Sequence, residues 1–330
     1  MTRPDPTIAD VGWTKYAGNP VLGGPLGTCF DISVDVSNGR YRMWFSWRPR
    51  NGIGYAESAD GLDWKAHEEV VLGPLPGDSS IEDLQVTRPF VLVEHELLTM
   101  WYSAHSIDRV VIARATSRDG VHWDRHGAVL TPEEPWEKAA LMCPSVIRDD
   151  DGLYHMWYSG GERYEPDAIG YATSRDGVTW TRVGDRPVLR PDRGSWDRDR
   201  VAGAHVFRHG AWLYAAYIGF ANGFEDSSIG IARSNDGIHW ERHAGNPVIT
   251  RGEPGEFDSI NVYKPFVVVD GDEWRMWFNG SSPTDGPDEN PPNRIEQIGY
   301  ASCRFEFQQR DLADIETNDQ ALAMDEASHV

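Results

Sequence analysis

Five positions of the chain combine unlike side chains with a common spacing, which makes them the first candidates for chemistry. Each lies 13 residues before an equivalent position, here called the fixed point, in an aromatic segment of the sequence. The exception is Cys143, which lies 14 residues before its fixed point because the intervening turn is one residue longer. These positions are Asp31, Arg88, Cys143, Gly203 and Lys264, and their fixed points are Trp44, Trp101, Trp157, Ala216 and Trp277. A carboxylate can act as a base or a nucleophile, and two cations can neutralise it or bind an anionic group. Structural positions of a repeated unit tend to stay alike, so five different residues at one position indicate a site.

The aromatic segments belong to a repeat that fixes the relative places of these positions. Variants of the phrase IGYATSRDGVTW recur along the chain at nearly even intervals. The copies begin at Ile53, Ile112, Ile169, Ile229 and, in truncated form, Ile298. Each repeat holds four extended segments rich in aromatic and β-branched residues, and an Asp-Gly turn gives a hairpin signal. No window shows a helical period. A repeat of this length with four strands is typical of a β-propeller blade.

The two ends of the chain predict how the blades close into a ring. The fifth copy ends at Phe305 without its fourth strand, and residues 13–22 read almost as a copy of residues 240–249. We therefore predict an all-β fold, a five-bladed β-propeller of four-stranded antiparallel blades. Residues 13–22 are predicted to be the outer strand of the last blade and to close the ring. The prediction makes residues 1–310 a single domain and residues 311–330 an acidic, disordered tail.

Composition narrows the partners and the compartment. The formal net charge of −21 disfavours nucleic acid and anionic membranes as partners. The chain starts without the apolar run of a signal peptide, and no stretch approaches the ~20 apolar residues of a membrane span. Three cysteines (Cys29, Cys143 and Cys303) lack metal-type spacing and indicate a reducing compartment. We expect a cytoplasmic protein, and the sequence leaves its oligomeric state open.

In a propeller the first strand of each blade lines the central channel, so the five positions form what we call the pore ring. Further polar residues are expected at the mouth or beside the ring. They are Asp83, Asp199 and Asn261, just before first strands, and Ser145 and His205, two residues beyond ring positions. His205 is either a core histidine satisfied by the backbone or a contact to substrate or metal. Arg88 and Lys264 either neutralise Asp31 or hold an anionic group of a substrate.

A second set of acids recurs at one position in four of the five blades. Its members are Glu82, Glu137, Asp197 and Asp258, each seven residues before the first-strand Pro or Ala. A repeated acid is most simply a structural cap or turn former. Asp31 resembles this set, but its spacing is different. Asp31 precedes Trp44 by the same interval as Arg88 precedes Trp101, whereas Glu82 lies six residues before Arg88. Asp31 therefore belongs to the pore ring.

The blade pattern P-x-V…D-G-x-Y-x-M-W-Y-S-G…I-G-Y-A-T-S-x-D-G-x-x-W is clearest from Pro144 onward. On this pattern, residues 13 to about 305 resemble the five-bladed propeller glycosidases, the group that contains glycoside hydrolase families 43, 32, 62, 68, 117 and 130. The resemblance implies that Asp31 is the base or nucleophile. A family-43-like pattern would also place acids at Cys143 and Ala202, and a family-32-like pattern at Arg88 and Met142. The usual set of three carboxylates is therefore incomplete.

The resemblance implies a glycoside hydrolase of carbohydrate metabolism that acts on a small oligosaccharide or glycoside. Its general acid would come from the mouth, where the candidates are Glu82, Asp83 and Asp199. The candidates for substrate binding are Arg88, Cys143, Ser145, His205, Asn261 and Lys264. One pore carboxylate with two cations also suits a glycoside phosphorylase, and the missing acids suit a non-catalytic carbohydrate-binding propeller. No cofactor or metal is required, although related propellers hold Ca²⁺ in the channel.

Overall fold

The computed structural model describes residues 12–75, 81–162, 164–223, 226–284 and 294–304. These residues are all-β, as predicted, and their helical elements are three short 3-10 helices. The helices are η1 (Gly24–Leu26), η2 (Arg48–Arg50) and η3 (Pro135–Glu137). The tail predicted for residues 311–330 lies outside the described residues.

The strands form four-stranded antiparallel units in which consecutive strands pair with each other. The first unit holds β2 (Cys29–Ser37), β3 (Arg40–Trp47), β4 (Gly52–Ser58) and β5 (Trp64–Ala66). The second holds β6 (Gln85–Glu94), β7 (Leu97–His105), β8 (Val110–Ser117) and β9 (Asp124–Leu130). The third holds β10 (Ala140–Arg148), β11 (Tyr154–Gly161), β12 (Ala168–Ser174) and β13 (Thr181–Arg182). A parallel bridge between Ala140 and Val110 joins the second and third units into one sheet.

The fourth unit repeats this order, and the fifth combines strands from both ends of the chain. The fourth holds β14 (Arg200–His209), β15 (Trp212–Ala221), β16 (Asp226–Ser234) and β17 (Glu241–Arg242). The fifth holds β18 (Asn261–Asp270), β19 (Glu273–Pro283), β20 (Arg294–Cys303) and β1 (Thr14–Lys15). Thr14 pairs with Ser302, and Leu22 forms an isolated bridge with Ile298. The same bridge joins Ile53 to Leu72, Ile169 to Leu189 and Ile229 to Ile249. The N-terminal segment thus occupies the outer position that other units fill from their own sequence.

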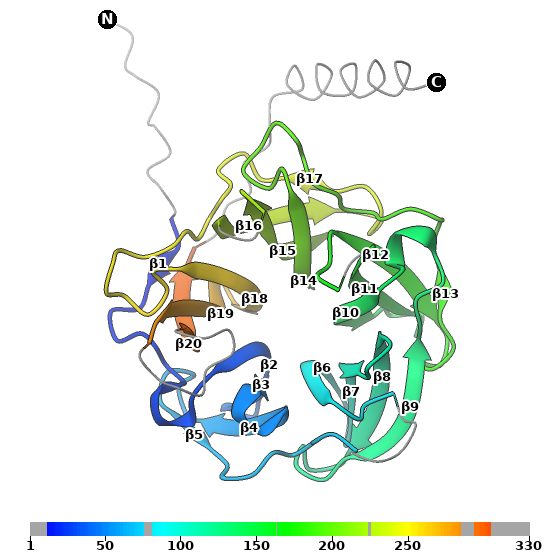
Figure 1. Cartoon of the computed structure of the whole chain (residues 1–330), viewed down its shortest axis with the longest axis horizontal. Coiled ribbons are helices and arrows are strands. Elements are labelled where there is room, and N and C mark those ends of the chain that lie inside the picture. The colour runs from blue at the N-terminus through cyan, green and yellow to red at the C-terminus, as the bar shows by residue number, and fades with distance from the viewer. Residues whose placement is uncertain (1–11, 76–80, 163, 224–225, 285–293, 305–330) are drawn as a thin grey trace, which may run out of the picture.

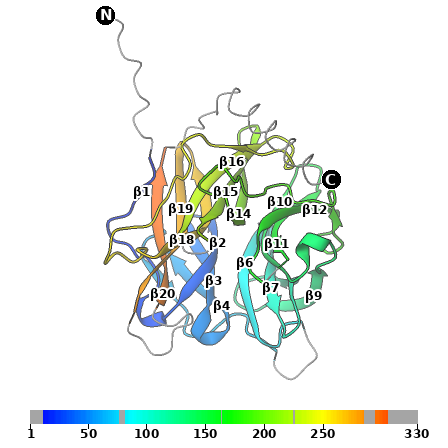
Figure 2. The ribbon, with the colours of Figure 1, turned by 45° about the horizontal axis from the view of Figure 1, so that its top comes forward.

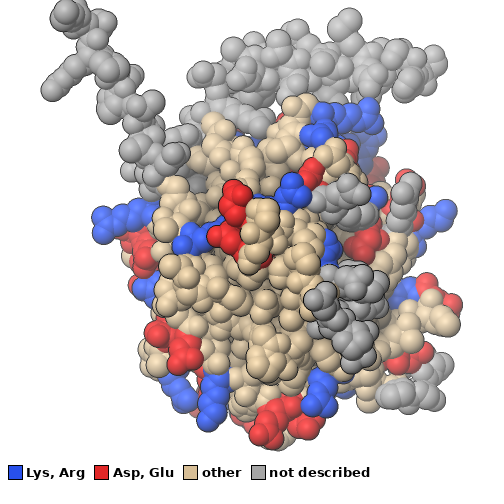
Figure 3. All heavy atoms as spheres, turned by 60° about the vertical axis from the view of Figure 1, so that its left-hand side comes forward, with Lys and Arg blue, Asp and Glu red and all other residues tan. Residues whose placement is uncertain are grey.

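The units lie around a common centre, with the first strand of each unit innermost (Figure 1). The inner strands contact one another in the order β2, β6, β10, β14 and β18, and β18 in turn contacts β2. Figure 2, tilted by 45°, shows the strands of each unit running side by side through the depth of the molecule. On the surface in Figure 3, acidic and basic side chains are interspersed.

Tryptophan side chains join four of the five units to the next. The indole Nε1–H of an aromatic-strand Trp donates to the carbonyl of the Asp-Gly turn in the following unit, at 2.8–3.1 Å. The pairs are Trp44 with Gly120, Trp101 with Gly177, Trp157 with Gly237 and Trp277 with Gly61. Ala216 stands at the fifth such position. The apolar cores lie between units in the same way, because Trp44 and Tyr55 pack in one cluster with Met100 and Tyr102.

Candidate functional site

The five pore-ring residues occupy one structural position. In every unit the pairing of the inner strand with the second strand shifts register at the ring residue, which marks a β-bulge. All five residues have a positive φ, from 47° at Asp31 and Lys264 to 57° at Gly203. A left-handed backbone is uncommon for residues other than glycine, and such strain is concentrated at functional sites. Counting along the repeat therefore found equivalent positions whose backbone is held in an unusual shape.

A bond from the preceding unit holds most of these bulges. The backbone N–H of the ring residue donates to a side-chain oxygen two residues beyond the aromatic fixed point of that unit. The pairs are Arg88 with Ser46 (2.8 Å), Cys143 with Ser103 (3.3 Å), Gly203 with Ser159 (2.8 Å) and Asp31 with Asn279 (3.1 Å). Ile218 occupies the fifth such position, before Lys264, and its side chain cannot accept a hydrogen bond. The backbone is thus fixed independently of the ring side chain, which leaves that side chain open to vary.

Three ring side chains form a buried charged centre. Asp31 is 3% exposed and Lys264 is 2% exposed. The Nε of Arg88 lies 3.1 Å from Oδ2 of Asp31. Burial raises the pKa of Asp31, whereas the charges of Arg88 and Lys264 act in the opposite direction. The centre therefore holds one carboxylate and two cations in a low-dielectric setting, where each charge acts strongly on its neighbours.

The other two ring residues line this centre. Cys143 is buried, and burial raises the pKa of its thiol while the charge of Arg88 opposes the shift. A Cβ added to Gly203 would lie 2.6 Å from Cδ1 of Ile218 and 3.1 Å from Cδ of Lys264. Glycine at this position thus leaves room for the stem of the lysine. The structure brings Asp31, Arg88, Cys143 and Lys264 together as the spacing predicts.

Residues two positions beyond the ring form a packed layer next to it. The ring of His205 stacks on Phe266, with centroids 3.9 Å apart, and lies 6.0 Å from Phe90. Its Nδ1 accepts from the backbone N–H of Val267 at 3.0 Å, and burial lowers its pKa well below the usual value. Of the two interpretations of His205, this packing favours the core histidine. Ser145 is also fully buried, and its Oγ accepts from the N–H of Val206 at 2.8 Å.

Glu82 lies in a buried ion pair that recurs in other units. The hydroxyl of Tyr102 donates to its carboxylate at 2.7 Å, and Nη1 of Arg125 on β9 lies 2.9 Å away. Equivalent trios are Glu137 with Tyr158 and Arg182, and Asp197 with Tyr217 and Arg242. In the fifth unit Asp258 pairs with Lys15 of β1 at 2.6 Å. These contacts fit a structural cap, the simpler interpretation of the set, and tie Glu82 to an outer strand.

Of the remaining sequence candidates, Asp83 and Asp199 lie just before inner strands, as expected, whereas Asn261 is the first residue of β18. Asp199 is exposed, and its Oδ2 accepts from the N–H of Gly223 at 2.8 Å, so it serves a turn. Asp83 is partly buried, and its Oδ1 has no hydrogen-bond partner within the described ranges. Asn261 is 7% exposed and pairs in register with Ser281 of β19. None of these contacts reaches Asp31.

Sequence reasoning missed a hydrogen-bonded path that runs outward from the ring. Nη1 of Arg88 donates to Oγ1 of Thr87 at 3.0 Å, and Thr87 is hydrogen-bonded to Nε2 of His105 at 2.7 Å. The hydroxyl of Tyr164 lies 3.1 Å from Nδ1 of His105. Burial, and then the charge of Arg88, lowers the pKa of His105 well below its usual value. The ring carboxylate is thus linked through Arg88 to a partly exposed tyrosine.

Sequence reasoning also missed an ion pair beside Asp31, between Arg48 of η2 and Glu296 of β20. Nη2 of Arg48 lies 2.9 Å from Oε2 of Glu296, and Glu296 is 7% exposed. The charge of Glu296 contributes to raising the pKa of Asp31. The repeat held the signal, because Glu296 stands two residues before the third-strand Ile298 and Arg48 four residues after Trp44. Counting to these mouth positions would have found both.

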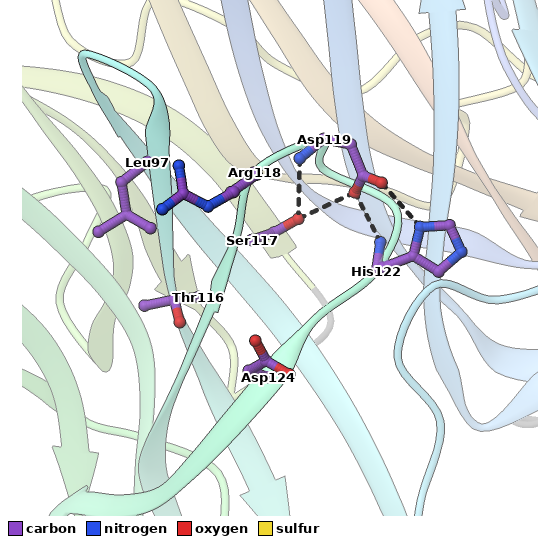
Figure 4. Close-up of a pocket in the computed structure, with 7 residues that line it drawn as sticks. All are labelled: Leu97, Thr116, Ser117, Arg118, Asp119, His122 and Asp124. Atoms are coloured by element: carbon purple, nitrogen blue, oxygen red, sulfur yellow. Dashed lines mark hydrogen bonds and ion pairs between the residues drawn. The ribbon is translucent and has the colours of Figure 1, made fainter.

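Other features of the described residues show no separate site. The pocket in Figure 4 lies at the turn between β8 and β9, where Asp119 accepts from the N–H groups of Val121 and His122 at 2.8 Å. Ser117 completes this turn, which recurs in other units and is therefore structural. Within the described ranges, no group of three or more His, Cys, Asp or Glu side chains could hold a metal ion. Nor does any helix in those ranges have the length and apolar character needed to cross a membrane.

Comparisons with known proteins show similarity to proteins named as glycoside hydrolases or glycoside-cleaving enzymes over parts of the chain. The family model of the glycosyl hydrolases family 32 N-terminal domain matches residues 100–243. The uncharacterized protein MT1551 of Mycobacterium tuberculosis is 28% identical over 195 residues, which span 56% of this chain and 61% of that protein. Raffinose invertase of Escherichia coli is 35% identical over 112 residues, or 29% of this chain and 23% of the invertase.

A solved structure extends the similarity over most of the chain. The β-1,2-mannobiose phosphorylase of Listeria innocua superposes with a TM-score of 0.68 at 16% identity, covering 88% of this chain and 96% of the phosphorylase. This likeness shows the fold. With the family-32 match it confirms the predicted resemblance to the propeller glycosidase superfamily, and the chain has a glycoside-hydrolase-like fold.

Proposed function

We propose that the protein is a glycosidase that acts on a small oligosaccharide or glycoside at the pore ring, with Asp31 as base or nucleophile. The observation that carries the proposal is the place of Asp31. It is a buried carboxylate on a left-handed bulge of the first inner strand, 3.1 Å from Arg88. Glycoside hydrolysis normally uses a carboxylate that attacks the anomeric carbon or activates the water that does so, and burial tunes the proton affinity of such a group.

The architecture proposed for this function is a single-domain, five-bladed β-propeller closed by the N-terminal strand. Two bonds between the last unit and the first support it, from Trp277 to Gly61 at 2.8 Å and from Asp31 to Asn279 at 3.1 Å. The cycle of contacts between inner strands supports it as well. In such a ring the pore-ring side chains of all blades converge on one substrate.

Turnover of a panel of aryl glycosides and oligosaccharides tests the function, with Asp31→Asn beside the wild type. We expect phosphate-independent release of sugar that the substitution reduces by roughly 10³-fold or more, since Asn can neither accept the proton nor attack carbon. Unchanged turnover in Asp31→Asn would refute the role of Asp31. Absence of turnover across the panel, with binding of sugars retained, would instead indicate a carbohydrate-binding propeller.

A glycoside phosphorylase is the second candidate, favoured by the excess of cations at the ring. Arg88 and Lys264 face a single ring carboxylate, and inorganic phosphate could replace water as the nucleophile between them. The same panel distinguishes the two functions. Turnover that requires phosphate, and that is weakened in Lys264→Met, would establish the phosphorylase. Turnover that is independent of phosphate would exclude it.

A further inference from the structure

The proposed glycosidase needs a second carboxyl group. Of the sequence candidates for it, Glu82 and Asp199 serve structural contacts, and no contact described for Asp83 reaches Asp31. Glu296 is a buried carboxylate on β20, in the unit that neighbours Asp31. Its charge acts on two residues of inner strands, because it contributes to raising the pKa of Asp31 and, after burial, that of Tyr263. Tyr263 directly precedes the ring residue Lys264. The strand β20 also contacts β2, which carries Asp31, so Glu296 lies at the edge of the pore ring, between the first and fifth units.

Two contacts hold Glu296 in place, and two more hold its partner Arg48. Nη2 of Arg48 lies 2.9 Å from its carboxylate, and the guanidinium of Arg48 lies over the ring of Phe30, 4.4 Å from the centroid. The backbone N–H of Glu296 donates to Oγ1 of Thr28 at 3.2 Å. The carbonyl of Thr28 accepts from the N–H of Arg48 at 3.1 Å. Thr28 and Phe30 flank the start of the strand that carries Asp31, so the two carboxylates share one support.

Buried polar atoms beside Glu296 point to a ligand at this place. Ser281, its register partner on β19, is fully buried, and Oγ of Ser281 has no hydrogen-bond partner within the described ranges. The same holds for Nε of Arg48, whose Nη2 binds Glu296. A buried donor or acceptor without a partner is costly, and its persistence calls for a molecule that supplies the bond. The hydroxyl groups of a sugar match one hydroxyl and one guanidinium N–H.

We propose that Glu296 is the second carboxyl group of the site and acts across the glycosidic bond from Asp31, an inference that rests on the proposed function. Because Asp31 is the proposed base or nucleophile, Glu296 in its protonated form gives its proton to the departing oxygen as the glycosidic C–O bond breaks. Where the reaction inverts, ionised Asp31 takes a proton from the water whose oxygen bonds to the anomeric carbon. Where it retains, Asp31 first bonds to that carbon, and water, which gives a proton to Glu296, then releases it. Exchange with solvent restores both groups, and the sum is addition of one water.

The test compares Glu296→Gln with a matched control, Asp167→Asn, on whichever aryl glycosides the wild-type protein hydrolyses. Asp167 stands two residues before Ile169, the repeat position equivalent to Glu296, and it also pairs with an arginine, Arg200. We expect Glu296→Gln to lower kcat by about 10²–10⁴-fold and Asp167→Asn to leave it within about twofold.

Two further measurements separate chemistry from support. If Glu296 donates the proton, the loss of kcat in Glu296→Gln should be much smaller for a dinitrophenyl leaving group than for a nitrophenyl one. A purely structural ion pair predicts no dependence on the leaving group, and an equal loss of turnover in Arg48→Gln; that pattern would overturn the assignment. Full activity of Glu296→Gln beside an active wild type would also overturn it, while a wild type without hydrolysis would refute the proposed function itself.

Discussion

Replacing Arg88 with methionine should separate the two effects of its ion pair with Asp31, on stability and on proton affinity. The pair is 3.1 Å long, and the side chains are 16% and 5% exposed. Removing one partner of a buried pair costs about 3–5 kcal/mol, because the other charge stays buried without compensation. Lys264 remains beside Asp31 and offsets part of this cost. We therefore expect a loss of about 3 kcal/mol, close to 100-fold in the unfolding equilibrium constant.

Denaturant titration at pH 7 measures this loss, with Arg40→Met as the matched control. Arg40 also pairs with a carboxylate, Glu57, but at 3.4 Å and with the two side chains 71% and 40% exposed. A pair at the surface contributes about 0–1 kcal/mol, so the control should lose little. A loss in Arg88→Met that is no larger than in Arg40→Met would contradict the buried-pair reasoning.

The same variant should shift the pH dependence of catalysis in a known direction. Burial raises the pKa of Asp31 above 3.8, and Arg88 is the largest influence that opposes the shift. A base or nucleophile must be ionised, so kcat/KM should rise with pH through this raised pKa. Without Arg88 the pKa rises further, and the acid limb of the profile should move to higher pH. A limb that stays in place or moves to lower pH would refute Asp31 as the titrating base.

Three further predictions concern the scaffold. Glu137→Gln should lower the free energy of unfolding by about 3–5 kcal/mol, because Glu137 is fully buried in its ion pair. Burial raises the pKa of Glu137, but Arg182 and Tyr158 outweigh it and lower the pKa, so the stabilisation from Glu137 should be lost as pH falls through the lowered pKa. Trp277→Phe removes a 2.8 Å hydrogen bond between units and should lower the free energy of unfolding, measured by denaturation, by about 1–3 kcal/mol. An unchanged free energy of unfolding would show that the bond does not stabilise the fold. Gly203→Ala should lower stability by about 1–3 kcal/mol and reduce turnover, because the added Cβ would press on the stem of Lys264 and the backbone φ at this position is 57°.

The sequence predicted the all-β repeat and the convergence of Asp31 with Arg88 because both depend on spacing, and the spacing is nearly constant. It could not reach the partners of these residues as easily. The Thr87–His105 contact depends on how strands pack, which the repeat does not encode. Counting along the repeat could have found the positions of Arg48 and Glu296, but not that the two side chains pair. The sequence could not decide whether Glu82 is a structural cap or the general acid, because only the structure shows its bonds to Tyr102 and Arg125.

The ring shows why one backbone position can carry five different residues. A left-handed bulge costs energy for every residue except glycine, and a side chain of the preceding unit holds the bulge by its backbone N–H. The ring side chain contributes nothing to that bond, so it can change without loss of the bulge. Lys264 departs from this rule because Ile218 precedes it. Its stem packs over Gly203 instead, so the chemistry of this cation depends on the absence of a side chain in the neighbouring unit.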